Sequence, residues 1–226
     1  MKPIIGIVAR VEYPGETHKL VFEEEYRKAI IKSGAIPLGI LPPQIIDYTT
    51  EKTSEQKELT EEEKTMLISQ MKLCDGILMP GGFKTNLFDM FILEYAIEND
   101  IPMLGICLGM QIMSNYKRKE LKNERNNSFI EHMVEEGYGH KVTIDKKSKL
   151  YQIVKNDSFL VTSRHNYHIY PNEEYVVSSV SDDNYIESIE MPNKKFNLGV
   201  QWHPEGLTDE YSKKLFEYFI YCCRCK

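Results

Sequence analysis

The sequence contains no long uninterrupted apolar run. Its N-terminal apolar stretch, from Lys2 to Ala9, covers only a few residues before Arg10 and Glu12 interrupt it. A secretory signal needs a longer apolar core, and a helix that crosses a bilayer needs about 20 mostly apolar residues. We therefore expect neither a leader nor a membrane span, and we expect the protein to reside in the cytoplasm.

An excess of positive charge is also missing. The chain has 28 Lys and Arg against 34 Asp and Glu, a net charge of −6 at pH 7. Nucleic acids and anionic membranes attract basic surfaces. We therefore predict neither as a partner.

The cysteines do not suggest a disulfide framework. There are five, an odd number, and Cys222, Cys223 and Cys225 crowd the end of the chain. The interval from Cys222 to Cys225 has no second pair or nearby histidine to complete a metal site, and the last four residues do not form a prenylation box. We expect no metal and no cofactor, and we interpret this cluster as a helix end with one packed cysteine, its role left open.

Alternation of strands and helices dominates the first half of a chain that is long enough for one large domain. Apolar runs bounded by Gly and Pro predict strands, and helical spacing predicts helices between them. This pattern is typical of a mainly parallel sheet covered by helices on both faces, a flavodoxin-like α/β fold. The predicted elements are strands 4–8, 36–41, 76–79 and 101–104, and helices 21–32 (with Gly34 as C-cap), 60–71 (with a capping box at Thr60) and 87–98.

The second half is richer in strands and predicts extra β-hairpins. Polar residues dominate segments 47–59 and 116–128, which we interpret as surface loops. No repeat or linker divides the chain. The predicted elements are strands 141–144, 159–162, 175–179, 185–189 and 196–201, and a last helix over 209–221.

A cysteine between two glycines is the most specific motif. Gly105-Ile-Cys107-Leu-Gly109 follows the apolar strand at 101–104 and precedes a predicted helix. This is the cysteine form of a nucleophile elbow, a sharp turn from strand to helix that needs small flanking residues. The N–H groups at the start of a helix would stabilise a thiolate there. Pro80-Gly81-Gly82 ends another predicted strand, and parallel sheets bind ligands at the carboxyl ends of their strands.

A cysteine nucleophile needs a base, and the base needs an orienting group. Of the six histidines, His203 has the best context, because Gly199-Val-Gln-Trp-His203 is a late strand that leads into Pro204-Glu205. A carboxylate at Glu205 can hold the imidazole in one tautomer. We assign no chemical role to the histidines at 18, 132, 140 and 168.

Together these motifs resemble the class I glutamine amidotransferases. The cysteine elbow and the His203-Pro-Glu205 sequence occur in the same order in that superfamily, and Pro80-Gly81-Gly82 is similar to its oxyanion loop. The peptidase C26 branch, which includes γ-glutamyl-γ-aminobutyrate hydrolases, is the most similar in segments spread over nearly the whole chain: Pro3–Arg10, Ala35–Pro42, Ser163–His165 and Asp183–Glu190.

The resemblance implies a role for each matching residue. Cys107 would be the nucleophile, His203 the base and acid, and Glu205 its orienting group. The backbone N–H groups of Gly82 and Leu108 would form the oxyanion hole. Gln111, Ser163 and His165 would bind the γ-glutamyl portion of a small-molecule substrate, and residues 1–226 would form a single domain.

Three functions are compatible with these residues. The resemblance favours a hydrolase that cleaves a γ-glutamyl amide through a glutamyl thioester and releases glutamate and an amine. The alternatives are a glutaminase subunit that delivers ammonia to a separate synthetase, and a non-catalytic protein that binds a γ-glutamyl metabolite. A homodimer is compatible with the sequence, which leaves the oligomeric state open.

Three segments depart from the branch's usual pattern. Asn166-Tyr167 replaces the expected His-Gln, Phe83–Asn86 replaces the usual continuation of the Gly-Gly loop, and the Gly-Gly-x-Leu segment is missing near Tyr116–Leu121. All three lie near the expected substrate pocket. They leave the identity of the leaving amine open.

Overall fold

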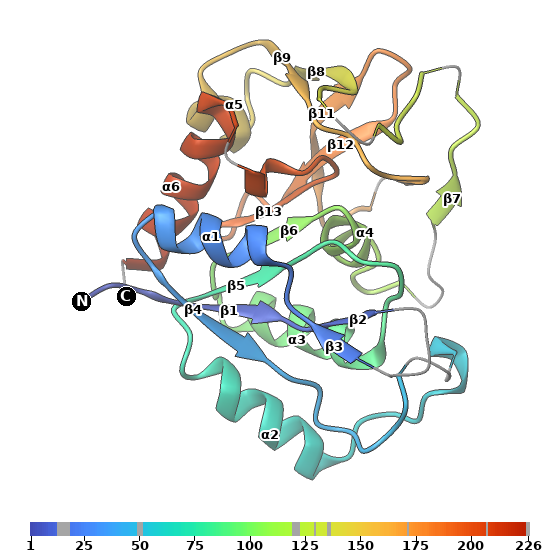
Figure 1. The fold of residues 1–226 in the computed structure, drawn as a ribbon, viewed down its shortest axis with the longest axis vertical. Coiled ribbons are helices and arrows are strands. Elements are labelled where there is room, and N and C mark those ends of the chain that lie inside the picture. The colour runs from blue at the N-terminus through green and yellow to red at the C-terminus, as the bar shows by residue number, and fades with distance from the viewer. Residues whose placement is uncertain are drawn as a thin grey trace.

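A nine-stranded sheet forms the centre of the computed structural model, which describes residues 1–12, 19–48, 52–118, 123–128, 130–134, 137–170, 172–206 and 208–224 (Figure 1). Five strands are parallel, and four antiparallel strands extend the sheet on one side, as predicted. The strand order is β4 (Ile36–Ile40), β1 (Ile4–Val8), β5 (Gly76–Met79), β6 (Met103–Ile106), β13 (Asn197–Val200), β12 (Ile186–Glu190), β11 (Val176–Ser181), β8 (His140–Ile144) and β9 (Ser158–Val161).

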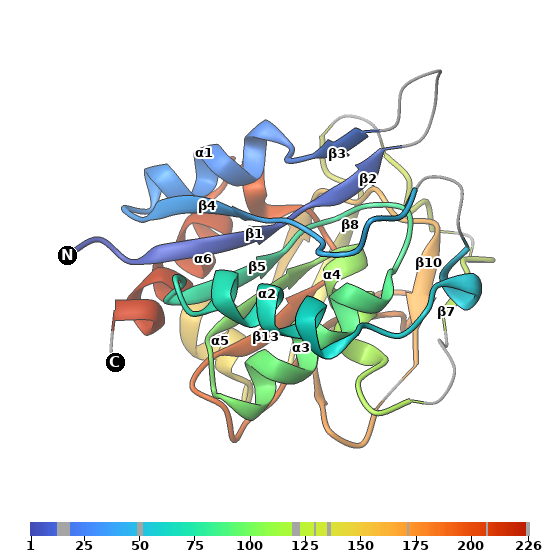
Figure 2. The ribbon, with the colours of Figure 1, turned by 90° about the horizontal axis from the view of Figure 1, so that it is seen from below.

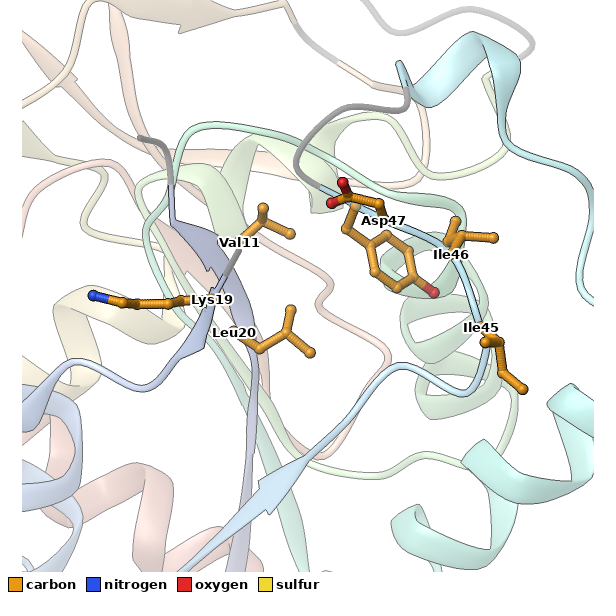
Figure 3. Close-up of a pocket in the computed structure, with 7 residues that line it drawn as sticks. Val11, Lys19, Leu20, Ile45, Ile46 and Asp47 are labelled. Carbon is orange, nitrogen blue, oxygen red and sulfur yellow. The ribbon is translucent and has the colours of Figure 1, made fainter. Parts of the chain in front are cut away.

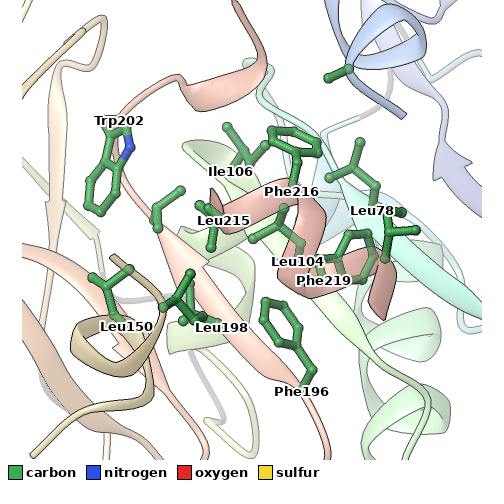
Figure 4. Packing of buried hydrophobic residues seen from close by; sticks show 14 of the residues in the cluster. Leu78, Leu104, Ile106, Leu150, Phe196, Leu198, Trp202, Leu215, Phe216 and Phe219 are labelled. Atoms are coloured by element: carbon green, nitrogen blue, oxygen red, sulfur yellow. The ribbon is translucent and has the colours of Figure 1, made fainter. Parts of the chain in front are cut away.

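Helices cover both faces of this sheet, which also confirms the prediction. One apolar core lies under α1 (Glu24–Lys32), α5 (Lys149–Val154) and α6 (Glu210–Arg224), and the other lies under α2 (Glu61–Met71), α3 (Leu87–Glu98) and α4 (Leu108–Ser114). Figure 2 shows α1 and α2 on opposite sides of the sheet. In Figure 4, Leu215, Phe216 and Phe219 of α6 pack against the β6 residues Leu104 and Ile106. Among the described residues, no helix combines the length and the apolar character needed to cross a bilayer.

Local sequence signals fix several helix ends. Thr60 begins α2 with a capping box, in which Glu63 N–H donates to Thr60 Oγ1 and Thr60 N–H donates to Glu63 Oε2. Gly34 follows α1 with a φ of +87°, a conformation that a glycine adopts without steric cost. Both signals are visible in the sequence, and both predicted helix ends are confirmed.

The structure corrects several predicted elements. The helix predicted from residue 21 begins at Glu24, because residues 19–21 form β3 (Lys19–Val21), the partner of β2 (Arg10–Glu12). Within the segment that we interpreted as a loop at 116–128, β7 (Asn123–Arg125) pairs with β10 (Tyr167–Ile169), while residues 119–122 lie outside the described residues. The last helix continues to Arg224, and α5 was not predicted.

The polar segment at 47–59 is also more integrated than a surface loop. Tyr48, Gln56 and Leu59 are buried, and a short 3-10 helix, η1 (Thr53–Glu55), lies between them. The Gln56 side chain accepts a hydrogen bond from Leu87 N–H at 3.1 Å and donates to Asn86 Oδ1 at 2.7 Å. This segment therefore caps the start of α3, a contact between distant residues that local polarity does not reveal.

The C-terminal cysteines are more deeply packed than predicted. Cys222 and Cys223 are both buried in the core beneath α6, where we expected one packed cysteine. Cys223 fills space beside Gly76, since a Cβ on that glycine would lie 2.3 Å from its sulfur. Burial raises the pKa of the Cys223 thiol, which is typical of an inert packing cysteine. Cys225 lies outside the described residues.

A buried ion pair ties the start of β2 to α3 and to the loop after β5. Arg10 donates through Nη1 to Asp89 Oδ1 and through Nε to the backbone oxygen of Pro80 at 3.1 Å. Asp89 is completely buried and also accepts from Asn86 N–H at 2.8 Å. Burial raises the pKa of Asp89, and the Arg10 charge opposes that shift. The Arg10 guanidinium therefore offsets part of the free-energy cost of burying the Asp89 carboxylate.

We expect Arg10→Met to lower the free energy of unfolding by about 3–5 kcal/mol, because it leaves the Asp89 charge buried without its partner. The double variant Arg10→Met/Asp89→Asn removes that charge as well. Urea unfolding of the wild type, both single variants and the double variant gives the coupling energy. Additive single effects would contradict this account.

Candidate active site

The residues singled out in the sequence lie at the ends of three neighbouring strands. β5, β6 and β13 are adjacent and parallel, with Met79 opposite Gly105 and Gly105 opposite Gly199. The chain leaves these strands toward Pro80-Gly81-Gly82, toward Cys107 and toward His203. Because parallel strands end on the same edge, these three segments meet there.

The elbow at Cys107 has an unusual backbone. Its φ is +50° and its ψ is −107°, it forms the N-cap of α4, and its N–H donates to Val200 O at 2.8 Å. A Cβ on Gly109 would lie 2.0 Å from the Met79 oxygen, and one on Gly105 would lie 2.3 Å from the Met113 sulfur. Both glycines are therefore required by close approach, as the elbow motif predicts. The Cys107 residue retains 7% exposure.

Gly81 brings the first loop against the other two segments. A Cβ on this residue would lie 3.2 Å from His203 Cε1 and 3.6 Å from Cys107 Cβ. The Gly81 N–H donates to the Tyr26 hydroxyl at 3.0 Å, and Tyr26 is buried in α1. This hydrogen bond fixes the loop directly beside the thiol and the imidazole.

His203 and Glu205 form a tight pair. Nδ1 of His203 lies 2.7 Å from Glu205 Oε1, and Glu205 is buried on the 3-10 turn η2 (Pro204–Gly206). Within the described residues, Nε2 of His203 has no aligned hydrogen bond, and it is the nitrogen left for Cys107. Burial lowers the pKa of His203, but the Glu205 charge and the Cys107 side chain outweigh it and raise that pKa to about 10.

The predicted oxyanion residues lie on facing segments. A Cβ on Gly82 would lie 3.1 Å from Leu108 Cδ2 and 2.9 Å from Arg10 Cδ. The loop carrying Gly82 and the first residue of α4 are therefore in contact beside Cys107. Arg10 supports this loop by donating to the Pro80 oxygen, a role that no local sequence motif indicates.

The predicted substrate-binding side chains are engaged with other parts of the protein. Gln111 is buried and donates to Gln201 Oε1 at 3.4 Å. Ser163 is completely buried, and its hydroxyl donates to the His132 oxygen at 2.7 Å. His165 lies in a buried cluster with His132, His140 and Glu187, which is also the one group among the described residues with the geometry to hold a metal ion.

Glu23 interacts electrostatically with His203, and Arg164 interacts with Glu23; neither residue was selected from the sequence. Partial burial and the Glu205 charge raise the pKa of Glu23, whereas the charges of His203 and Arg164 lower it. Glu23 immediately precedes α1, and Arg164 lies between Ser163 and His165. An acidic group is thus coupled to His203 and Glu205, and a basic group is coupled to that acidic group. Only their positions in space reveal this, because no local motif contains them.

A separate cavity of about 480 Å³ lies between the β2–β3 hairpin and the segment after β4. In Figure 3, Val11 and Leu20 face Ile46 and Asp47 across it. Its described lining includes neither Cys107 nor His203. We therefore locate the candidate chemistry by the strand ends and not by this cavity.

We expect Glu205→Gln to lower the pKa of His203 from about 10 toward the ordinary value near 6.5, because the Glu205 charge is the largest cause that raises it. An NMR titration of the His203 ring protons measures this shift. Glu210→Gln, a change at an exposed carboxylate on α6, is the matched control and should leave the His203 pKa unchanged. An unaltered His203 pKa in the Glu205→Gln variant would show that the pair is not electrostatically coupled.

Known proteins resemble this chain in sequence and in fold. A CTP synthase of Lactobacillus johnsonii is 35% identical over 185 residues, which cover 66% of this chain and 34% of that enzyme, so the match spans about a third of the relative's length. The gamma-glutamyl-gamma-aminobutyrate hydrolase of Escherichia coli K12 is 27% identical over 98% of this chain and 94% of its own. The glutaminase domain of the Trypanosoma brucei CTP synthase, solved with bound acivicin, has the same fold, with a TM-score of 0.65, 19% identity, and coverage of 100% of this chain and 95% of that one.

A family match complements these likenesses. Residues 84–205 match the peptidase C26 family, and this segment contains the elbow, His203 and Glu205. The match extends over more than half of the sequence. The chain therefore belongs to the peptidase C26 family.

Proposed function

We propose that this protein hydrolyses the γ-glutamyl amide bond of a small molecule, with Cys107, His203 and Glu205 as its catalytic triad. One observation carries the proposal: Gly81 lies directly against both Cys107 and His203, while His203 is paired with Glu205 at 2.7 Å. A thiol, an oriented imidazole and a loop of backbone N–H groups are the parts that acyl transfer requires. Membership of the peptidase C26 family supports a reaction at a C–N bond.

The first half-reaction forms a thioester. The raised pKa of His203 favours its imidazolium form, and the reacting nucleophile is the Cys107 thiolate. The thiolate attacks the γ-carbonyl carbon, and the N–H groups of Gly82 and Leu108 stabilise the oxyanion, each worth roughly 3 kcal/mol. The imidazolium then gives its proton to the amine nitrogen as the C–N bond breaks, and the glutamyl group stays on the sulfur.

The second half-reaction uses the neutral imidazole that remains. His203 removes a proton from water, and the resulting hydroxide adds to the thioester carbon. The carbon–sulfur bond breaks, glutamate leaves, and the thiolate–imidazolium pair is restored. Glu205 accepts a hydrogen bond from His203 Nδ1–H throughout, so that Nε2 always faces the reacting atoms.

The substrate class rests on charge and on the relatives. A γ-glutamyl group carries an ammonium and a carboxylate at its far end, and the coupled pair of Glu23, which interacts with His203, and Arg164 supplies the opposite charges. The E. coli relative is named for γ-glutamyl-γ-aminobutyrate. We propose a γ-glutamyl amide of this general kind, acted on in the cytoplasm. Gln111, Ser163 and His165 remain predicted substrate-binding residues, and the single-domain organisation also remains a prediction.

A second function is favoured by the CTP synthase relative. Over 185 residues, about a third of that enzyme's length, the two sequences are 35% identical. The same thioester chemistry with glutamine would release ammonia, which a separate synthetase could consume. In that case the protein would be a glutaminase subunit with a macromolecular partner.

We expect purified wild-type protein to release glutamate from γ-glutamyl-γ-aminobutyrate and from other γ-glutamyl amines, and Cys107→Ala to lower kcat/KM by at least about 1,000-fold. Glutamine is assayed in parallel, alone and with candidate synthetases. Released glutamate is the measurement. Vigorous turnover of γ-glutamyl amines by the isolated chain favours the hydrolase, whereas glutamine turnover that rises only with a synthetase favours the subunit.

Cys74→Ala is the matched control, because it removes another free thiol. Burial raises the pKa of Cys74 to about 11, and its sulfur contacts the Gln70 oxygen at 3.5 Å. Cys74 precedes β5 and therefore lies away from the carboxyl ends of the strands, where the candidate site is. Its activity should equal that of the wild type. Equal activity of the Cys107→Ala variant would rule out the thioester mechanism.

A further inference from the structure

Four buried side chains meet in the antiparallel half of the sheet, outside the candidate triad. His132 lies between β7 and β8, His140 begins β8, His165 lies between β9 and β10, and Glu187 belongs to β12. One potential ligand atom from each of the four lies within 4.8 Å of every other, and all four residues are buried. Figure 1 shows β8 and β12 together at the end of the sheet farthest from α2.

The separations match those of ligands around one ion. His132 Nδ1 lies 3.1 Å from His165 Nε2, and Glu187 Oε1 lies 3.5 Å from each of these nitrogens. The same oxygen lies 3.1 Å from His140 Nε2. Tetrahedral ligands bound to zinc at 2.0–2.1 Å are about 3.4 Å apart. Four of the six separations are therefore already close to that value.

In two of the imidazole rings, the nitrogen that faces away from the other ligands (the outer nitrogen) lies against a hydrogen-bond acceptor. His132 Nε2 lies 2.9 Å from Asp183 Oδ2, and His165 Nδ1 lies 3.0 Å from the Tyr167 oxygen, with Asn126 Nδ2 a longer contact at 3.4 Å. A carboxylate and a carbonyl can only accept, so the ring protons lie on these outer nitrogens. The lone pairs of His132 Nδ1 and His165 Nε2 then point at each other. Metal-bound histidines are oriented by outer partners of this kind.

A proton shared between His132 and His165 would satisfy those two nitrogens alone. Among the described residues, Glu187 has no aligned hydrogen bond at either carboxylate oxygen although it is completely buried, and His140 has none at either nitrogen. His140 is close to Glu187 without an N–H directed at it. The potential ligand atoms of all four residues converge within 4.8 Å of one another, and a cation at their centre would satisfy them together.

We propose that His132, His140, His165 and Glu187 bind a single Zn²⁺ ion. Three imidazoles and one carboxylate suit Zn²⁺, and four protein ligands make a closed, structural site without an open position. No short sequence motif contains this zinc site, because the four ligands are spread over residues 132–187. From the sequence alone we expected no role for His132 and His140 and no metal.

The ion would hold loops that support the candidate triad. His165 N–H donates to the His132 oxygen at 2.9 Å, and Gln201 N–H donates to the Glu187 oxygen at 2.8 Å. His203 N–H donates to the Thr162 oxygen at 3.2 Å, three residues before His165. His165 and Glu187 therefore lie on segments that hydrogen-bond to the chain around His203. None of the four ligands takes part in a bond-making step of the thioester chemistry, and a zinc-bound His165 would support the site instead of contacting the substrate.

The test is zinc binding by the whole chain, purified without a polyhistidine tag and stripped with a chelator. We expect one Zn²⁺ per wild-type chain by elemental analysis and by titration against a competing chelator, and a higher Tm with Zn²⁺ that a chelator reverses. Glu187→Gln and His140→Gln should each weaken Zn²⁺ binding at least 100-fold. Asp183→Asn, which alters only an outer partner, should weaken it about 10–100-fold.

His168→Gln is the matched control, since His168 stacks on Tyr185 nearby and is not one of the four ligands. This variant should bind Zn²⁺ as the wild type does. The proposal is overturned if stripped, folded wild-type protein takes up no Zn²⁺ at millimolar concentration. It is also overturned if Glu187→Gln and His140→Gln, shown to be folded by circular dichroism, bind it as tightly as His168→Gln.

Discussion

The arrangement of this protein depends on one close contact, that of Gly109 with the carbonyl of Met79. A left-handed backbone at a residue such as Cys107 costs of order 1–3 kcal/mol and persists only where its surroundings enforce it. The contact between Gly109 and Met79 enforces the Cys107 conformation, because α4 can begin at Cys107 only when its first turn lies on the end of β5. The Gly-Gly loop leaves β5 at that same point. The position of the thiol and the position of the loop are thus set by one contact, and the hydrogen bond from Cys107 to Val200 adds β13 and His203 to it.

Much of this arrangement follows from local sequence. The glycines around Cys107, the strand before His203 and the alternation of strands and helices are short-range patterns, and each predicts an element whose end lies on the same edge of a parallel sheet. The capping signals at Thr60 and Gly34 are equally local. The parallel half of the fold and the three strand-end segments were therefore predictable.

The remainder depends on pairings between distant residues. Gln56 caps α3 from 31 residues away, and Arg10 reaches Asp89 across 79 residues. The buried histidines come from segments that meet only because β8 and β12 both flank β11. Polar residues in such places resemble surface residues when the sequence is considered alone. Their burial shows that polar contacts between distant segments help to organise both halves of the chain.

The hydrogen bond from Gly81 to Tyr26 links the mechanism to a helix that carries none of the proposed triad. Tyr26 is fixed by its burial in α1, so the orientation of the Gly81 peptide depends on how α1 is seated on the sheet. A disturbance that tilts α1 without unfolding it would turn that peptide and displace the neighbouring Gly82 amide. Turnover would then fall while global stability stayed nearly constant. The inner surface of α1 is therefore expected to evolve as slowly as an active-site loop, even though it lies outside the region that matches the family.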